Sequence, residues 1–285
     1  MIIVTGATGQ LGRGIVEQLL KRLPAAKIGV SVRRVEKAQD LVALGVRVRR
    51  GDFDDAASLR LAFEGASQVL MVSSNAASTG GDPIAQHRTA IEAAKAAGVT
   101  RVVYTSQISS SLSSAFNPGV DHGKTELMLR ESGLAFTALR NGFYASHALG
   151  ILGNAIKKGE LMAPKDGKFS WTAHADLAEA AAAILADEGR FDGATPPLTG
   201  SEALDFADLA ALASQVSGKD ISRVTVSDED YLARMVQGGT PARVAQFALG
   251  MFVASRRGEF AAVDPTLEGL VGHRPRTLRE LFAAH

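Results

Sequence analysis

Residues 2–20 read IIVTGATGQLGRGIVEQLL, and this stretch decides the fold. The β-branched run at 2–5 predicts a buried strand, and the segment from Gln10 onward has the spacing of an amphipathic helix. The glycines between them permit unusual backbone torsions and carry no Cβ to block a pyrophosphate, which the N-terminus of the helix can hold. We therefore predict a dinucleotide-binding loop, with a merely structural turn as the alternative, made by Gly6, Thr8, Gly9, Gln10, Leu11 and Gly12.

The alternation of strand and helix continues to about residue 145. Strands are predicted at 2–6, 27–33, 46–52, 68–74, 101–106 and 136–141, and helices at 10–22, 36–44, 56–63, 83–97 and 121–132. Glycine follows four of these helices, where a left-handed C-cap favours it. This rhythm predicts an α/β fold of Rossmann type, a doubly wound parallel sheet with helices on both faces.

Beyond residue 145 the alternation weakens, and helices are predicted at 175–187, 206–217, 228–237 and 242–256. We therefore predict an NAD(P)-binding Rossmann domain at 1–145, completed by later segments. Residues 146–285 are predicted to form a smaller, helix-rich, substrate-binding lobe. A substrate site is expected between the two lobes.

Composition narrows the class of protein. The chain has 285 residues, 31 Lys plus Arg against 30 Asp plus Glu, and no cysteine. The near-neutral charge gives no reason to expect nucleic acid or membrane as a partner, and the lack of cysteine excludes disulfides and thiolate metal sites. His87, His147, His273 and His285 are too scattered to predict a metal site. We expect a soluble, cytoplasmic protein with a small-molecule partner, either a monomer or a homodimer.

The end of the second strand indicates which dinucleotide binds. An acidic residue at this point would accept hydrogen bonds from the ribose of NAD and would repel the extra phosphate of NADP. Residues 31–37 read SVRRVEK, with no acid at the strand end. Arg33 and Lys37 can contact a 2′-phosphate, so NADPH is preferred over NADH. The alternative is a solvated basic helix start.

Two further strand ends carry candidate cofactor residues. In GDFDD, residues 51–55, Asp52 can accept a hydrogen bond from the adenine amine and Phe53 can flank the ring. Their two acidic neighbours can equally cap the following helix. In LMVSSN, Ser73 and Ser74 are expected beside the pyrophosphate and the nicotinamide ribose, or else simply open a polar loop.

Several longer motifs resemble one family. They are TGATGQLG at 5–12, VRRVEKAQDL at 32–41, AAKAAGV at 93–99 with YTS at 104–106, HGKTELML at 122–129, LRNGFY at 139–144 and GLVGHRPRTL at 269–278. Together they resemble the NmrA-like atypical short-chain dehydrogenase/reductases over essentially the whole chain, and within them the type 2 NAD(P)H:quinone oxidoreductases and triphenylmethane reductases. The resemblance implies NADPH-dependent reduction of a quinone.

The tyrosine–lysine pair of most short-chain dehydrogenases is missing from the expected helix. If His122 takes the place of the tyrosine, Glu126 stands where the lysine belongs, four residues on. This counts against alcohol dehydrogenation and sugar epimerisation. A quinone, however, accepts hydride readily and gives a stabilised anion that solvent can protonate, so positioning alone can suffice.

Acceptor-site candidates follow the sixth strand in LRNGFY. Asn141 can hydrogen-bond a quinone oxygen or the nicotinamide carboxamide, and Phe143 or Tyr144 can stack on the ring. His122 is a further pocket candidate. Alternatively, the aromatics pack the lobe interface, Asn141 caps a helix and His122 merely starts one. Two other functions also stay open: a non-catalytic NADP-binding redox sensor, and a reductase or epimerase with a dyad from elsewhere in the chain.

Overall fold

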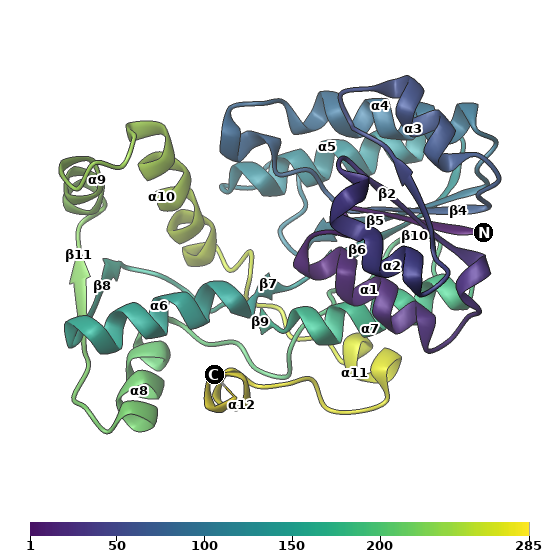
Figure 1. Ribbon diagram of the computed structural model, residues 1–285. Coiled ribbons are helices and arrows are strands. Elements are labelled where there is room, and N and C mark those ends of the chain that lie inside the picture. The colour runs from purple at the N-terminus through teal and green to yellow at the C-terminus, as the bar shows by residue number, and fades with distance from the viewer. Residues whose placement is uncertain (285) are drawn as a thin grey trace. The chain divides into compact units, whose positions relative to one another are not determined.

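The chain folds into two compact units, and the computed structural model describes residues 1–284 (Figure 1). Unit 1 comprises Met1–Ser106, Asp121–Arg140 and His174–Pro196. Unit 2 comprises Gln107–Val120, Asn141–Ala173 and the chain from Pro197 onward. Each unit is therefore assembled from three separate segments.

Unit 1 is built on a seven-stranded sheet, which confirms the predicted fold class. Its strands are β1 (Ile2–Thr5), β2 (Ile28–Val32), β3 (Arg47–Arg50), β4 (Gln68–Met71), β5 (Arg101–Gln107), β6 (Ala135–Asn141) and β10 (Gly193–Ala194). They lie in the order β10-β6-β5-β4-β1-β2-β3, and β1 pairs in parallel with both β2 and β4. The order reverses between β1 and β4, which is where ligands of such sheets bind, at the carboxyl ends.

Helices cover both faces of this sheet. They are α1 (Gln10–Leu20), α2 (Gln39–Ala43), α3 (Ala56–Phe63), α4 (Pro83–Ala96), α5 (Asn117–Glu131) and α7 (His174–Ala186). Figure 1 shows α3, α4 and α5 on one face and α1 and α7 on the other. A Cβ added at Gly14 of α1 would lie 3.1 Å from the Ala178 Cβ of α7, so these two helices pack closely.

Two predicted helices of unit 1 differ from the observed ones. The expected helix at 36–44 is a 3-10 turn, η2 (Val35–Ala38), followed by the short α2. The helix expected to start at 121 begins at Asn117. Pro118 is compatible with the earlier start, because a proline in the first turn of a helix costs no hydrogen bond.

The core of unit 1 between the sheet and α3, α4 and α5 is continuous. Its buried side chains come from the strands and from the helix faces packed on them, as a sheet covered by helices requires. Among them are Ile3, Leu59, Phe63, Val69 and Tyr104. This packed core fixes the positions of the strands whose carboxyl ends carry the candidate site.

Unit 2 is mostly helical. It contains β7 (Phe143–Tyr144), α6 (Ala145–Lys158), β8 (Glu160–Pro164), β9 (Trp171–Thr172), α8 (Phe206–Ser217), β11 (Ser222–Val226), α9 (Asp228–Gln237), α10 (Ala242–Arg256), α11 (Thr266–Val271) and α12 (Leu278–Ala283). Helix α6 is missing from the sequence prediction. Its buried positions Ala148, Leu152 and Ala155 nevertheless have helical spacing.

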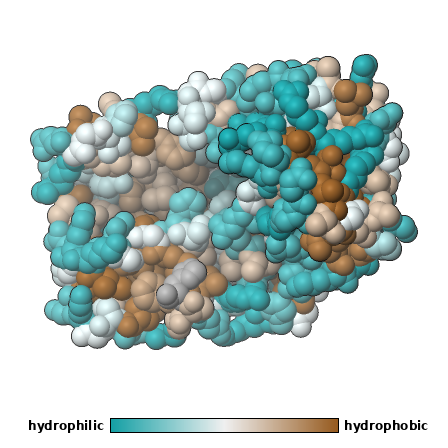
Figure 2. All heavy atoms as spheres, in the orientation of Figure 1, coloured by the Kyte–Doolittle hydropathy of each residue, from teal (hydrophilic) through white to brown (hydrophobic). Residues whose placement is uncertain are grey.

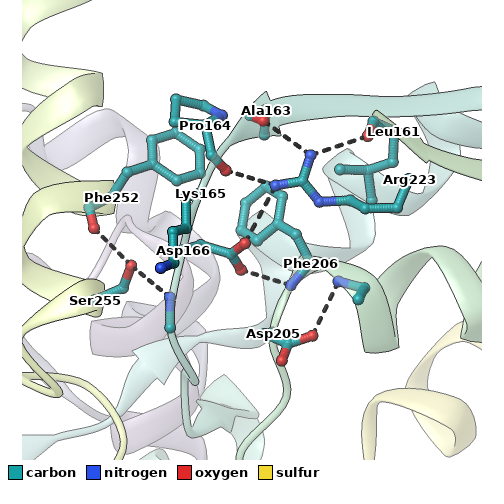
Figure 3. Close-up of polar contacts among 12 residues, drawn as sticks. Leu161, Ala163, Pro164, Lys165, Asp166, Asp205, Phe206, Arg223, Phe252 and Ser255 are labelled. Atoms are coloured by element: carbon teal, nitrogen blue, oxygen red, sulfur yellow. Dashed lines mark hydrogen bonds and ion pairs between the residues drawn. The ribbon is translucent and has the colours of Figure 1, made fainter. Parts of the chain in front are cut away.

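A partly buried guanidinium, that of Arg223, connects several elements of unit 2 (Figure 3). Arg223 of β11 donates to the carbonyl oxygen of Ala163 in β8 at 2.8 Å and to Asp166 Oδ1 at 3.2 Å. Asp166 Oδ2 accepts from the backbone N–H of Phe206, the first residue of α8, at 2.7 Å. The three elements therefore hold one another through a satisfied charge pair.

The surface is mixed in character. Figure 2 shows apolar residues, in brown, among polar ones, in teal, on the face drawn. Within residues 1–284, no helix combines the length and the apolarity needed to cross a membrane.

Candidate functional site

The loop between β1 and α1 is tight and depends on glycine. Gly6 has a φ of +63°, a conformation that side chains rarely adopt, and the Gly9 N–H donates to its carbonyl oxygen at 2.9 Å. A Cβ at Gly12 would lie 2.4 Å from the Gly6 carbonyl oxygen. The helix therefore approaches the loop backbone more closely than any side chain at Gly12 would permit.

The N-terminus of α1 is open to an anion. Its N-cap residue is Gly9, no side chain caps it, and its first turn contains no acidic residue. Thr8 and Gln10 are exposed, whereas the Leu11 side chain is buried, so Leu11 can offer a ligand only its backbone N–H. Unpaired N–H groups and the positive end of the helix dipole together suit a phosphate.

Three exposed cations follow β2. Arg33, Arg34 and Lys37 form no side-chain hydrogen bond or ion pair with the described part of the chain. Arg13, in contrast, is paired with Glu17 at 2.9 Å and with Asp40. The cations after β2 are therefore available to a negatively charged ligand.

The acidic residues after β3 have different roles. Asp55 caps α3, accepting from the Ser58 N–H at 3.0 Å, as one predicted alternative held. Asp54 accepts from the Gln86 amide at 2.9 Å. Within residues 1–284, the carboxylate of Asp52 accepts only from the Asp54 N–H, at 3.2 Å, and Asp52 is half-buried. Phe53 packs partly against the unit 1 core. Of the three carboxylates, Asp52 therefore has the fewest internal bonds.

The serines after β4 are held by their neighbours. The Ser73 N–H donates to Thr105 Oγ1 at 2.8 Å, and the Ser74 N–H donates to His87 Nε2 at 2.8 Å. The Ser74 hydroxyl also donates to Gln86 Oε1 and accepts from the Ala76 N–H. The Ser74 hydroxyl is thus committed to the protein, and Ser73 has the freer hydroxyl.

His87 is a structural residue that the sequence analysis did not assign to the site. It is only 1% exposed, and because Nε2 accepts from Ser74, Nδ1 carries the proton and donates to Thr125 Oγ1 at 2.8 Å. Burial lowers the pKa of His87 to about 3, so the ring is neutral. His87 shares the buried face of α4 with Ala90, Ile91 and Ala94, and that helical spacing was the available signal.

The expected dyad position holds a different pair. The hydroxyl of Tyr104 on β5 lies 2.7 Å from His122 Nδ1 on α5. The surrounding protein shields the His122 ring from water, and this desolvation lowers the pKa of His122 to about 4. Glu126 is buried and accepts from Arg140 Nη2 at 2.8 Å and from Ser106 Oγ at 2.6 Å. A carboxylate held by a guanidinium therefore occupies the position at which most short-chain dehydrogenases have a lysine.

In unit 2, Asn141 is 2% exposed and its Oδ1 has no hydrogen-bond partner among the described residues. A buried acceptor without a partner is costly, and a ligand donor would relieve that cost. Burial raises the pKa of the neighbouring Tyr144, whose hydroxyl also contacts the Asn141 amide. Asn141 and Tyr144 therefore form a polar pair with one acceptor to spare.

Phe143 lies inside the core of unit 2. Its ring centroid is 5.4 Å from that of Trp171 and 5.0 Å from that of Phe260, with Phe169 also close. Little of this ring is left for a ligand, and the packing alternative fits it better than stacking on an acceptor.

The strand order, the glycine loop and the open N-terminus of α1 together define a Rossmann-type nucleotide-binding protein. A model of the NmrA-like family matches residues 1–280. The chain belongs to this family.

Individual relatives align with this chain over nearly its whole length. Quinone oxidoreductase 2 of Escherichia coli (strain K12) is 37% identical over 281 residues, which are 98% of this chain and 96% of the relative. The structure of the NADPH-dependent quinone oxidoreductase from E. coli, complexed with NADPH, superimposes with a TM-score of 0.93 at 36% identity, covering 100% of this chain and 99% of the other. The Citrobacter sp. triphenylmethane reductase complexed with NADP(H) gives 0.88 at 32% identity, with the same coverage.

Proposed function

We propose that this protein is an NADPH-dependent reductase that transfers hydride to a quinone or a similar conjugated acceptor. The observation that carries the proposal is the whole-chain likeness to the E. coli quinone oxidoreductase solved with NADPH, at 36% identity and a TM-score of 0.93. Function on a Rossmann fold depends on the site rather than on the fold, so the residues themselves must also suit the cofactor and the acceptor.

The residues of unit 1 fit a dinucleotide phosphate. The N–H groups at the start of α1 have no capping side chain, and Gly6, Gly9 and Gly12 leave the loop backbone accessible. In our proposal these glycines, with Thr8, Gln10 and the backbone of Leu11, hold the pyrophosphate.

The strand ends beside the loop provide the remaining contacts in this proposal. Arg33 and Lys37 bind the 2′-phosphate, because both are exposed cations without an internal partner in the described chain. Asp52 and Phe53 contact the adenine. Ser73 contacts the ribose on the nicotinamide side through its hydroxyl, and Ser74 lies beside it.

The acceptor side of the proposal rests on Asn141. Its buried, unpartnered Oδ1 suits an N–H or O–H donor, such as the nicotinamide carboxamide or a reduced acceptor. Tyr144 orients the amide from the next strand, and Phe143 supports both from the core. His122, tied to Tyr104, completes the predicted pocket residues.

The chemistry requires little of the protein beyond position. NADPH supplies the hydride when it is bound. The chain's own task is to orient cofactor and acceptor and to exclude water. In well-oriented reactions, such positioning lowers the activation barrier by up to about 7–11 kcal/mol. Solvent can protonate the reduced acceptor, so the carboxylate at Glu126 in place of a lysine is compatible with turnover.

The test is NADPH consumption, followed by its absorbance, with a small para-quinone, and with NADH in parallel. We expect saturable turnover that favours NADPH. NADPH also should raise the melting temperature, since a ligand at about 100 times its Kd stabilises by about 2.7 kcal/mol. Tight NADPH binding without turnover on several quinones would contradict a reductase and indicate a cofactor sensor instead.

The proposed partner is a small molecule. The cysteine-free composition fits a cytoplasmic location, which fractionation of the producing cells would test. Sedimentation of the purified chain would distinguish the monomer from the homodimer.

A further inference from the structure

A cavity within unit 2 lies beside α9 and has a volume of about 550 Å³. This volume lies within the range of small-ligand sites. The walls come from α6, β8, α9 and α10 and from the first residue of α8. Figure 1 shows α9 and α10 above β8 and α6, at the left of the view. No residue of this cavity is among the cofactor or acceptor residues expected from the sequence.

The walls of this cavity are largely apolar. The methionine and aromatic residues that line it are Met162, Met235, Met251, Phe206, Tyr231 and Phe252. Methionine side chains are flexible and fill irregular gaps, so a surface rich in methionine adapts to ligands of differing shape. The cavity therefore suits a flexible apolar ligand.

Helix α9 has an apolar face that the protein covers incompletely. Tyr231, Arg234 and Met235 line the cavity together, because residues three and four apart lie on one face of a helix. The ring centroid of Tyr231 lies 5.3 Å from that of Phe252. Of the ten described residues of α9, however, none is buried. An apolar ligand in the cavity would cover more of this face, and the burial of apolar surface is favourable.

A second wall of the cavity is fixed by packing. Phe252 is only 2% exposed, and its ring centroid lies 5.1 Å from that of Phe206. Behind Phe206, Arg223 Cζ lies 5.8 Å from the ring centroid, and the same guanidinium donates to the Ala163 carbonyl oxygen at 2.8 Å (Figure 3). This wall is therefore in place before a ligand binds.

The charged lining residues indicate the charge of the ligand. Lys158, at the end of α6, and Arg234 are exposed, and neither side chain bonds to the described part of the chain. Among the described lining residues, Glu160 is the one acid, so the cations outnumber it. Burial raises the pKa of Tyr231, so its hydroxyl stays protonated and can donate a hydrogen bond. Two available cations and a hydroxyl donor favour a carboxylate.

We propose that this cavity binds a fatty acid, with the apolar chain among the methionines and the carboxylate at Lys158 and Arg234. The inference goes beyond the proposed reductase, because the site needs neither NADPH nor a hydride acceptor. Longer chains bury more methylene groups, so decanoate binds about tenfold more tightly than octanoate does.

The first experiment tests the charges, by calorimetry on the full-length protein without NADPH. We expect decanoate to bind, and Lys158→Gln and Arg234→Gln each to weaken its binding about 3- to 10-fold. Neither variant should change the affinity for 1-decanol, which has the same chain and no charge. Lys157→Gln, in the same turn of α6 but outside the cavity lining, is the matched control and should bind decanoate as the wild type does.

The second experiment tests the apolar wall. Met235→Glu puts a carboxylate beside the bound chain, so we expect decanoate and 1-decanol both to bind at least about tenfold more weakly. Val236→Glu is the matched control, because Val236 is 48% exposed and does not line the cavity. Since α9 has no buried side chain among its described residues, both variants should keep the melting temperature of the wild type.

Several results would overturn this site. They are no binding of decanoate, unchanged decanoate affinity in both Lys158→Gln and Arg234→Gln, and equal effects of Met235→Glu and Val236→Glu. Self-association of the wild type that Met235→Glu abolishes would assign the cavity to a second copy of the chain instead. None of these measurements needs turnover, so a protein that binds decanoate here but reduces no quinone would contradict only the proposed reductase.

Discussion

At the scale of single residues, Arg33 is the side chain that should separate the two nicotinamide cofactors. We expect Arg33→Ala to weaken NADPH binding about 10- to 100-fold, because a hydrogen bond to a charged group contributes about 1.5–3 kcal/mol, and to change NADH binding little. Fluorescence titration with both cofactors measures this. Arg60→Ala, at an exposed arginine of α3, is the matched control. Equal losses for NADPH and NADH would remove Arg33 from the phosphate site.

His87 makes the stability of the protein depend on pH. Its pKa is about 3 when folded, below the ordinary value of 6.5, so the folded state binds fewer protons than the unfolded state. The contribution of His87 to stability is complete above pH 6.5 and is lost as the pH falls from there toward 3. Between pH 7 and pH 5 the free energy of unfolding should fall by about 2 kcal/mol from this group alone.

Urea unfolding at pH 7 and pH 5 tests this dependence. His87→Gln can still accept from the Ser74 N–H but does not titrate, so its stability should fall by about 2 kcal/mol less than that of the wild type over this interval. His273→Gln, at an exposed histidine, should behave like the wild type. Parallel pH profiles for wild type and His87→Gln would show that His87 is not the titrating group.

Single residues were predictable where their role is local. Asp55 has the spacing of an N-cap, and the structure confirms it as the cap of α3. The role of His87 was not predictable, because its partners Ser74 and Thr125 lie 13 and 38 residues away. The burial of Phe143 was not predictable either, because its ring packs on residues far away in the sequence, such as Phe260.

At the scale of elements, the loop from β1 to α1 should tolerate far less change than the middle of α6. In Gly12→Ala the new Cβ would meet the Gly6 carbonyl oxygen at 2.4 Å, and the backbone there has no room to move. We expect a loss of about 1–3 kcal/mol in stability together with weaker NADPH binding. Gly150→Ala in α6, where a Cβ meets nothing within 4 Å, should stabilise by about 0.5–1 kcal/mol.

Thermal unfolding of both variants with and without NADPH measures these effects. A Gly12→Ala variant with wild-type stability and cofactor affinity would contradict the close approach in this loop. The elements themselves were predictable in unit 1, where apolar strands and stop glycines repeat. Helix α6 was missed because Gly150 and Gly153 interrupt its pattern, and its stability comes from packing that the sequence does not display.

At the scale of the whole molecule, the predicted boundary at residue 145 can be tested directly. A fragment of residues 1–145 lacks α7 and β10, which belong to unit 1. The face of α1 that packs on α7 would then be exposed. We expect the fragment to bind a hydrophobic dye and to unfold without a cooperative transition, unlike the full chain. Cooperative melting and NADPH binding by the fragment would instead support 1–145 as a self-sufficient domain.

The division of each unit into three segments also bears on how the protein is made. The last strand of the sheet, β10, is synthesised only after two segments of unit 2, Gln107–Val120 and Asn141–Ala173. At about 5–20 residues per second, the roughly 50 residues between β6 and β10 take about 3–10 s to synthesise, and until then β6 lacks its partner strand. During that interval the early strands have an open edge and apolar surface, so a chaperone that shields nascent chains has most to protect in this window.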